Sequence, residues 1–161
     1  MKTAVARVVE ALWGMGVEAQ VREFPHSTRT ADEAAAAIGA QVGQIVKSLV
    51  FVAGEQPILA LVSGANRADT AKLAALTGAP IRRADADTVR AATGYAIGGV
   101  PPVGHTTPLP SYLDRALLGY TTVWAAAGTP NAVFPIAPSE LERITDAQVV
   151  DLAAEPREEV G

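Results

Sequence analysis

The sequence predicts a single α+β domain with a mixed, mostly antiparallel β-sheet. Its 161 residues suffice for one compact core, and 49% of them are hydrophobic against 19% charged. This balance excludes an intrinsically disordered chain, which would be poor in apolar residues. Helical and alternating apolar patterns follow one another without an internal repeat or a linker. We therefore expect one domain over residues 1–154 and a frayed, charged tail over 155–161.

The first two elements are predicted by two different apolar periods. Val5, Val8 and neighbouring apolar residues recur at helical spacing until Gly14 interrupts them. Apolar and polar residues then alternate over 17–21, which is typical of a half-buried strand. A proline ends this strand, and a polar loop over 26–29 follows.

Capping residues, proline and glycine mark the further helices. Thr30 and Glu33 form a capping-box pattern, in which each side chain satisfies a free backbone amide of the first turn. Thr145 and Gln148 repeat this pattern, and Pro138 is suited to a first helical turn. Asp85 can cap a further short helix, and glycine, a common left-handed terminator, ends three of these helices. The helices predicted in this way cover residues 31–38, 69–76, 86–92, a segment starting at Pro138, and 145–153.

Apolar runs rich in β-branched residues predict the strands. Turns at 54–57 and 128–131 each separate two such runs, and the first pair is expected to form a central hairpin. The predicted strands are 45–53, 58–62, a short one around Ile81, 120–126 and 132–136.

The segment from Gly94 to Pro110 is rich in glycine and proline, yet apolar residues are spaced along it. It is therefore predicted to be a long, ordered loop of the kind that often carries function. Paired Gly98 and Gly99 let a ligand approach the backbone and can direct amides at a developing oxyanion. A rigid structural crossover is the alternative. The segment 128–131, taken alone, is simply a turn.

The residue inventory disfavours several kinds of site. There is no cysteine, and the two histidines, His26 and His105, lie far apart without an HExxH motif, so neither a metal nor another cofactor is expected. No GxSxG elbow and no P-loop occur. No apolar run approaches the ~20 residues that cross a bilayer, so we expect a cytoplasmic protein without a membrane partner. A net charge of -4 argues against a broad grip on nucleic acid.

Lys47 interrupts the apolar run Ile45-Val46-Lys47-Ser48-Leu49-Val50-Phe51-Val52. A lysine in a central strand loses solvation unless its ammonium group reaches a cleft or a partner. One interpretation is an edge-strand lysine that extends to water or protects against aggregation. The other is an anion anchor, for instance for a phosphate group.

Four blocks together resemble the YbaK/EbsC family, the editing domains associated with aminoacyl-tRNA synthetases. The resemblance runs from about Val17 to Leu152, and the order and spacing of the blocks are more specific than any one of them. They are TADEAA at 30–35, IVKSLVF at 45–51, TGYAIGGVPPVG at 93–104, and Ala127-Gly128 ahead of PSEL at 138–141, with Asp114 and Leu117 between them.

The resemblance implies a mixed β-sheet curved toward a barrel, with helices around it. It also implies hydrolysis of the ester that joins a wrong amino acid to tRNA, most often a small residue such as alanine or cysteine on proline tRNA. Lys47 matches the lysine that holds the 3′-terminal nucleotide. Gly98 and Gly99 match glycines that line the aminoacyl pocket and polarise the ester carbonyl, and Gly128 matches a glycine on the opposite wall.

The residues around these glycines are expected to bind the substrate. They are Val100, Pro101, Pro102, Gly104, His105, Thr129 and Asn131. Pro101 stands where the common family loop has a serine, which removes one hydroxyl and one amide from the pocket wall. His105 is either a specificity or acid–base residue or a surface residue. Because no catalytic triad is present, positioning and electrostatics, with activation of water by the substrate, would supply most of the rate.

Two functions of different classes follow from these observations. The first is a free-standing trans-editing deacylase whose partners are the 3′ acceptor end of tRNA and, as a candidate, prolyl-tRNA synthetase. The second is a non-catalytic module of the same fold that binds a nucleotide, an aminoacyl-adenosine or a protein. A hydrolase of small amino-acid esters is a third, weaker alternative. Lys47, with Arg67, Lys72, Arg82 and Arg83 nearby, would supply the local anchor that a substrate of this kind needs.

Overall fold

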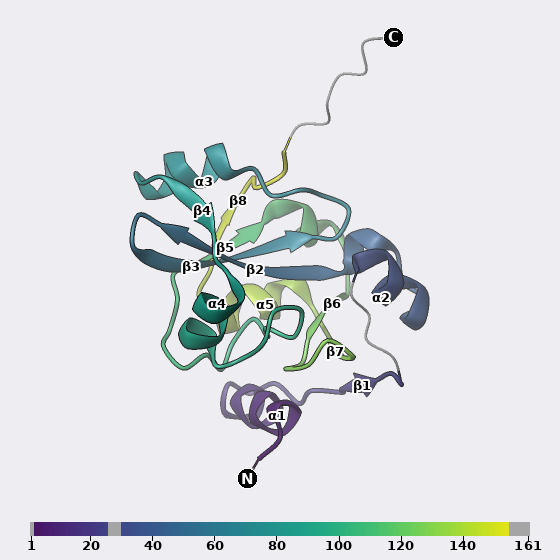
Figure 1. Ribbon diagram of the computed structural model, residues 1–161. Coiled ribbons are helices and arrows are strands. Elements are labelled where there is room, and N and C mark those ends of the chain that lie inside the picture. The colour runs from purple at the N-terminus through teal and green to yellow at the C-terminus, as the bar shows by residue number, and fades with distance from the viewer. Residues whose placement is uncertain (1, 26–29, 155–161) are drawn as a thin grey trace.

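The computed structural model describes residues 2–25 and 30–154, which fold into helices packed on two β-sheets (Figure 1). The helices are α1 (Ala4–Gly14), α2 (Ala31–Ile38), α3 (Thr70–Thr77), α4 (Ala86–Thr93) and α5 (Pro138–Thr145), with 3-10 helices η1 (Val42–Gln44) and η2 (Arg115–Gly119). The strands are β1 (Arg22–Glu23), β2 (Val46–Ala53), β3 (Gln56–Ser63), β4 (Ile81–Arg83), β5 (Ser111–Asp114), β6 (Val123–Ala126), β7 (Ala132–Ile136) and β8 (Gln148–Val150).

The larger sheet has the strand order β4-β2-β3-β5-β8 and the smaller one β1-β7-β6. All pairs are antiparallel except β3 with β5 and β5 with β8, which are parallel. This confirms the mixed, mostly antiparallel α+β fold. The sheets do not close into a barrel; in the part of the chain that the structure describes, a single parallel bridge between Ile45 and Trp124 joins them.

Both faces of the larger sheet are buried, which explains why the β2–β3 hairpin reads as almost continuously apolar. Val46, Val50 and Val52 point into one hydrophobic cluster with β6, β7, α4 and α5, and the intervening Phe51 and Ala53 point into a second cluster with α3. Figure 1 shows α3 on one side of the hairpin and α4 and α5 on the other.

The predicted helix caps are confirmed where the sequence signals were complete. Thr30 Oγ1 accepts a hydrogen bond from the Glu33 amide at 3.1 Å, and Gly39 ends the helix with a φ of +74°. The Asp85 carboxylate accepts from the Thr88 amide at 2.8 Å at the start of α4. These caps satisfy backbone groups that the helix itself leaves unpaired.

Two element predictions are wrong. Residues 17–21 alternate between half-buried and exposed, as their pattern predicts, but they form no strand with any described residue; pairing with β7 begins only at Arg22. The predicted helix over 145–153 is instead β8, because Thr145 closes α5, with its hydroxyl bonded to the Leu141 carbonyl at 2.7 Å. Residues 148–150 then pair with β5, a partner distant in sequence that a local capping pattern cannot reveal.

The short elements β5 and η2 were not predicted, and the strand expected over 120–126 begins at Val123. The predicted polar loop at 26–29 and the tail at 155–161 lie outside the described residues. No helix of the described residues has the length and hydropathy needed to span a bilayer.

Candidate functional site

A cavity of about 460 Å³ lies along the edge of β2. β4 pairs with β2 only at Phe51–Ala53. Apart from the bridge at Ile45, no described strand pairs with residues 46–49 on that side. The cavity therefore occupies the place that a further strand would otherwise take, between β4 and β6.

The walls of the cavity come from elements that are far apart in the sequence. Apolar side chains from β2, α4, β6 and β7 form most of its surface. Its ionisable lining residues are Asp32 from α2, Lys47 from β2 and Arg83 from β4, and the glycine-rich loop contributes Ile97, Gly98 and Val100.

The two paired glycines have different roles in this wall. A β-turn is closed by a hydrogen bond from the Gly99 amide to the Ala96 carbonyl at 3.0 Å. Gly98, at its third position, has a φ of +88°, as a type II turn requires. Gly98 lines the cavity. Gly99 packs behind it: an added Cβ would lie 2.8 Å from Gly128 O and from Thr129 Cα.

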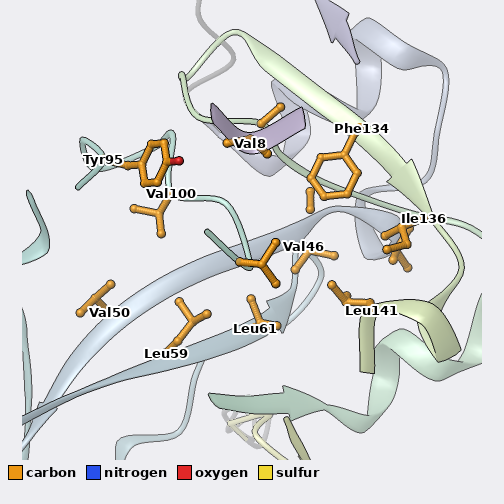
Figure 2. Close-up of a cluster of buried hydrophobic side chains, with 14 of the residues drawn as sticks. Val8, Val46, Val50, Leu59, Leu61, Tyr95, Val100, Phe134, Ile136 and Leu141 are labelled. Atoms are coloured by element: carbon orange, nitrogen blue, oxygen red, sulfur yellow. The ribbon is translucent and has the colours of Figure 1, made fainter. Parts of the chain in front are cut away.

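The amides of this loop differ in whether they are available to a ligand. Gly99 N–H is used within the turn. Among the described residues, no partner is found for the amides of Gly98 and Val100, which flank it and line the cavity. Unpaired amides in a partly buried loop are uncommon and suit a carbonyl or anionic oxygen of a ligand. Figure 2 shows Val100 over the same apolar cluster as Val46 and Val50 of β2.

Lys47 lies at the rim of the cavity, on the sheet face that α3 covers. Its ammonium group donates a hydrogen bond to the main-chain carbonyl of Asn66, in the connection between β3 and α3. Partial burial lowers the pKa of Lys47, and the positive charge of Arg83, and to a lesser extent that of Arg67, adds to this effect, while Asp114 opposes it. A cation destabilised in this way gains more than usual from an anionic ligand.

The other expected cations differ in how they are used. Lys72 is bonded to the Asp151 carboxylate at 2.8 Å and to the Ala153 carbonyl, so its charge is directed to the β8 end of the molecule. Arg83 lines the cavity, and within the described residues neither Arg83 nor Arg67 forms an ion pair. Arg82 precedes Arg83 on β4 but does not line the cavity.

The second half of the glycine-rich loop packs away from the cavity. Pro101 and Pro102 are buried and do not line it. His105 lies with its Nε2 atom 2.6 Å from the Pro101 carbonyl, and burial lowers its pKa. Gly104, at a φ of +80°, lies against Ala11 of α1. His105 therefore braces the loop rather than facing the cavity.

The turn between β6 and β7 is likewise mainly structural. An added Cβ on Gly128 would lie 2.9 Å from the Ala4 backbone, so this glycine lets α1 approach the turn. Thr129 Oγ1 donates to Asn131 Oδ1, and Asn131 Nδ2 donates to the Phe24 carbonyl, each at 2.8 Å. Pro130, between them, is the residue of this turn that lines the cavity.

Some lining residues were not among the expected site residues. Asp32 belongs to the block at 30–35, which contributed to the resemblance and to a capping pattern but not to the expected site, and Trp124 belongs to a strand without an unusual pattern. Ser48 also lines the cavity, and its hydroxyl is the one buried side-chain polar atom without a hydrogen-bond partner in the described residues. No group of three metal-ligating side chains occurs in residues 2–25 and 30–154.

Comparison with known proteins identifies the family of this chain. The family model described as the aminoacyl-tRNA editing domain matches residues 26–144, most of the chain. The chain belongs to the aminoacyl-tRNA editing domain family. The blocks that carry Lys47, Gly98 and Gly128 all lie within the matched segment, and the resemblance drawn from the sequence is confirmed.

Relatives of this editing domain occur both alone and inside larger enzymes. The uncharacterised protein YwhH of Bacillus subtilis is 35% identical over 82% of this chain and 85% of its own length. EbsC of Enterococcus faecalis, named as a candidate Cys-tRNA(Pro)/Cys-tRNA(Cys) deacylase, is 28% identical over 76% of each protein. A proline–tRNA ligase of Streptococcus pyogenes is 30% identical over 81% of this chain but only 21% of the ligase.

Solved structures share the whole architecture. A candidate trans-editing enzyme for prolyl-tRNA synthetase is 56% identical, with a TM-score of 0.92 over 96% of this chain and 99% of that one. The hypothetical protein APE2540 is 32% identical, with a TM-score of 0.85 over 92% of this chain and 99% of that one. The fold described above therefore extends over nearly the full length of both of these solved chains.

Proposed function

We propose that this editing domain hydrolyses the ester that joins a wrong amino acid to the 3′ end of tRNA. The proposed substrate is proline tRNA that carries alanine, cysteine or another small residue. The observation that carries the proposal is the cavity itself, which is lined mainly by apolar side chains together with Lys47, Arg83 and the two loop residues, Gly98 and Val100, whose amides have no partner in the described residues. The family match and the names of EbsC and of the trans-editing neighbour support it.

The loop amides supply the electrostatic part of this chemistry. Water adds to the ester carbonyl carbon, and negative charge develops on the carbonyl oxygen, where the amides of Gly98 and Val100 can donate hydrogen bonds. The bond from that carbon to the ribose oxygen then breaks. One proton of the water passes to the departing ribose oxygen and the other is released to solvent, so the amino acid departs as a carboxylate.

A group on the substrate is proposed to activate the water. His105 is held against the Pro101 carbonyl and does not line the cavity. Asp32 is the only carboxylate among the described lining residues. It is placed to receive the α-ammonium group of the amino acid by charge complementarity. The ribose hydroxyl next to the ester is proposed to accept a hydrogen bond from the water and to relay its proton to the departing ribose oxygen, so the rate depends mainly on positioning.

The cavity suits a small aminoacyl group with part of its nucleotide. Its volume of about 460 Å³ lies within the ~300–1,000 Å³ of small-molecule sites. Val46, Val50 and Val100 face it with apolar surface, which favours alanine or cysteine side chains over charged ones.

Lys47 and Arg83 are proposed to bind the phosphates of the acceptor end of tRNA. The net charge of -4 leaves the protein without a broad basic surface, so affinity for tRNA is expected to be weak and sensitive to salt. Delivery of the substrate by prolyl-tRNA synthetase would compensate for this weakness. Since its proposed substrate is a tRNA used in translation, we propose that the protein acts in the cytoplasm.

Single-turnover deacylation of alanyl-, cysteinyl- and prolyl-tRNA(Pro) tests the proposal. We expect release of at least one misattached amino acid well above the rate in buffer, with prolyl-tRNA(Pro) spared. Lys47→Ala should reduce this rate by roughly a hundredfold while circular dichroism stays unchanged. The outcome that contradicts the proposal is no release of any small amino acid, which would favour a non-catalytic binding module.

Simple amino-acid esters provide the second arm of the test. If alanine ethyl ester were hydrolysed as fast as alanyl-tRNA, Lys47 and Arg83 would contribute no substrate binding and the protein would be a general esterase. We expect turnover of the ethyl ester to be slower, because binding energy from the nucleotide is used to position the ester.

A further inference from the structure

Asp114, at the end of β5, is a buried carboxylate with no ion-pair partner in the described residues. Only 1% of its surface is exposed. Its Oδ2 atom accepts hydrogen bonds from the Ser63 amide at 3.2 Å and from Asn66 Nδ2 at 3.0 Å, and Oδ1 accepts from the Ala116 amide at 3.1 Å. Burying a charge costs free energy unless nearby groups compensate it. The three hydrogen-bond donors provide this compensation for Asp114, and one of them, Asn66, leads to Lys47.

The donor Asn66 connects this carboxylate to the cavity. Its side-chain amide is bonded to Asp114, and its main-chain carbonyl accepts the hydrogen bond from the Lys47 ammonium group. The turn that carries it is fixed at two further points, by the Asn66 amide on the Ser63 carbonyl at 2.9 Å and by Ser63 Oγ on the Gly43 carbonyl at 2.7 Å. The turn that carries the carbonyl bonded to Lys47 is thus held by hydrogen bonds to β3, β5 and η1.

We propose that Asp114 is a positioning residue for Lys47. Through Asn66 it fixes the carbonyl that orients the ammonium group at the rim of the cavity, and its carboxylate favours the charged form of that group beside two arginines. Lys47 faces Arg83 from β4, Arg67 from the connection after β3, and Asp114 from β5. The first two disfavour the charged form and Asp114 favours it, in line with the directions of their effects on the pKa of Lys47.

The effect of Asp114 on catalysis rests on the proposed function, but its effect on the pKa of Lys47 can be measured without substrate. The chain has three lysines, Lys2, Lys47 and Lys72. In protein labelled with 13C-lysine, the ε-CH2 signals are therefore few, and Lys47→Arg assigns the relevant one. We expect the pKa of Lys47 to be lower in Asp114→Asn than in the wild type, because the opposing negative charge is gone.

Asp69→Asn is the matched control. Asp69 is also a capping carboxylate in the neighbourhood of the same connection, bonded to the amides of Ala71 and Lys72, but it makes no contact with Asn66 or Lys47. Asparagine caps helices about as well as aspartate. We expect the pKa of Lys47 to be unchanged in this variant. An unchanged Lys47 pKa in folded Asp114→Asn would overturn the electrostatic half of the proposal.

Asn66→Ala tests the positional half and avoids a change at the buried carboxylate. Asn66 is only partly buried, and its removal leaves Asp114 two of its three donors, so the variant is expected to fold. We expect kcat/KM for misacylated tRNA to fall roughly tenfold or more. In a Lys47→Ala background the same change should have almost no further effect, because both act through one group.

Two outcomes separate this inference from the proposed function. If the wild type releases no amino acid but the pKa of Lys47 falls in Asp114→Asn, the proposed function fails and the electrostatic control of Lys47 stands. If the wild type is active while Asn66→Ala has wild-type kcat/KM, or its effect adds fully to that of Lys47→Ala, the positioning role is refuted and the carboxylate only caps η2.

Discussion

Gly99→Ala should disable the cavity although Gly99 itself does not line it. The added Cβ would lie 2.8 Å from Gly128 O and from Thr129 Cα, whereas ordinary contacts begin at 3.4 Å, so the two segments must separate by about 0.6 Å (3.4 − 2.8). The 128–129 side cannot retreat easily, because Gly128 is itself in close contact with the Ala4 backbone. The displacement therefore falls on Gly98 and Val100, and moves the loop toward the cavity.

Two magnitudes follow from this displacement. Overpacking of this kind destabilises a protein by about 1–3 kcal/mol, which corresponds to a fall in Tm of roughly 2–4 °C per kcal/mol in a chain of this size. A shift of the loop amides by a large fraction of an ångström should reduce kcat/KM by roughly ten- to a hundredfold. We expect KM to change less than kcat, since the amides act mainly on the developing oxyanion.

Single-turnover deacylation and thermal unfolding, measured on the same preparation, check both numbers. Gly14→Ala is the control, because no atom lies within 4 Å of its added Cβ and the residue is at the end of α1. It should keep wild-type activity and equal or slightly higher stability. Gly99→Ala with wild-type Tm and wild-type kcat/KM would refute the assigned packing of the loop.

Three further predictions concern the rim, a buried hydroxyl and the loop histidine. Arg83→Gln should raise KM for tRNA several-fold and lower the slope of log KM against log salt by about 1. Arg90→Gln, outside the cavity lining, should leave KM and this slope unchanged. Equal slopes in the wild type and Arg83→Gln would exclude Arg83 from phosphate binding. Ser48→Ala should raise the free energy of unfolding in urea by about 1 kcal/mol, since it removes an unpaired buried hydroxyl; a decrease would show that the hydroxyl has a partner. Burial lowers the pKa of His105 from its ordinary 6.5. As the pH falls, His105 is therefore protonated in the unfolded chain before it is protonated in the folded one. The stability that neutral His105 contributes is complete above pH 6.5 and declines below it. Between pH 7.5 and 5.5 the wild type should therefore lose more stability than His105→Gln, and an equal loss in both proteins would contradict this assignment.

The chemistry of the site was more predictable than its geometry. Lys47 stands out in the sequence because it is a cation in an apolar run. Gly98 stands out because it belongs to a glycine pair in a loop that is predicted to be ordered. Both line the cavity. Gly128 was assigned to the opposite wall by resemblance, but it packs against α1. That contact joins the first residues of the chain to its last third, and no local pattern encodes it.

The same distinction holds for the fold. Caps at Thr30 and Asp85 were predictable because their hydrogen bonds span three residues. β5 and β8 were missed because each is short and pairs in parallel with a strand far away in sequence. The free edge of β2 could not be foreseen either: it depends on β4 ending its pairing at Phe51, and this ending creates the space for the cavity.

The distribution of ion pairs explains how an acidic chain can present a positive site. In the described residues, Lys2, Lys72 and Arg143 are paired with carboxylates. Arg67 and Arg83 form no such pair there, and Lys47 is bonded to a neutral carbonyl. Arg83 and Arg67 both lie close enough to act on the charge of Lys47, so these three cations form a positive group at one rim, while the net charge of -4 disfavours contact of the remaining surface with phosphates. An RNA is accordingly favoured to approach with one end, over few phosphates, and the salt slope of its binding should be much shallower than that of a protein with 6–10 phosphate contacts.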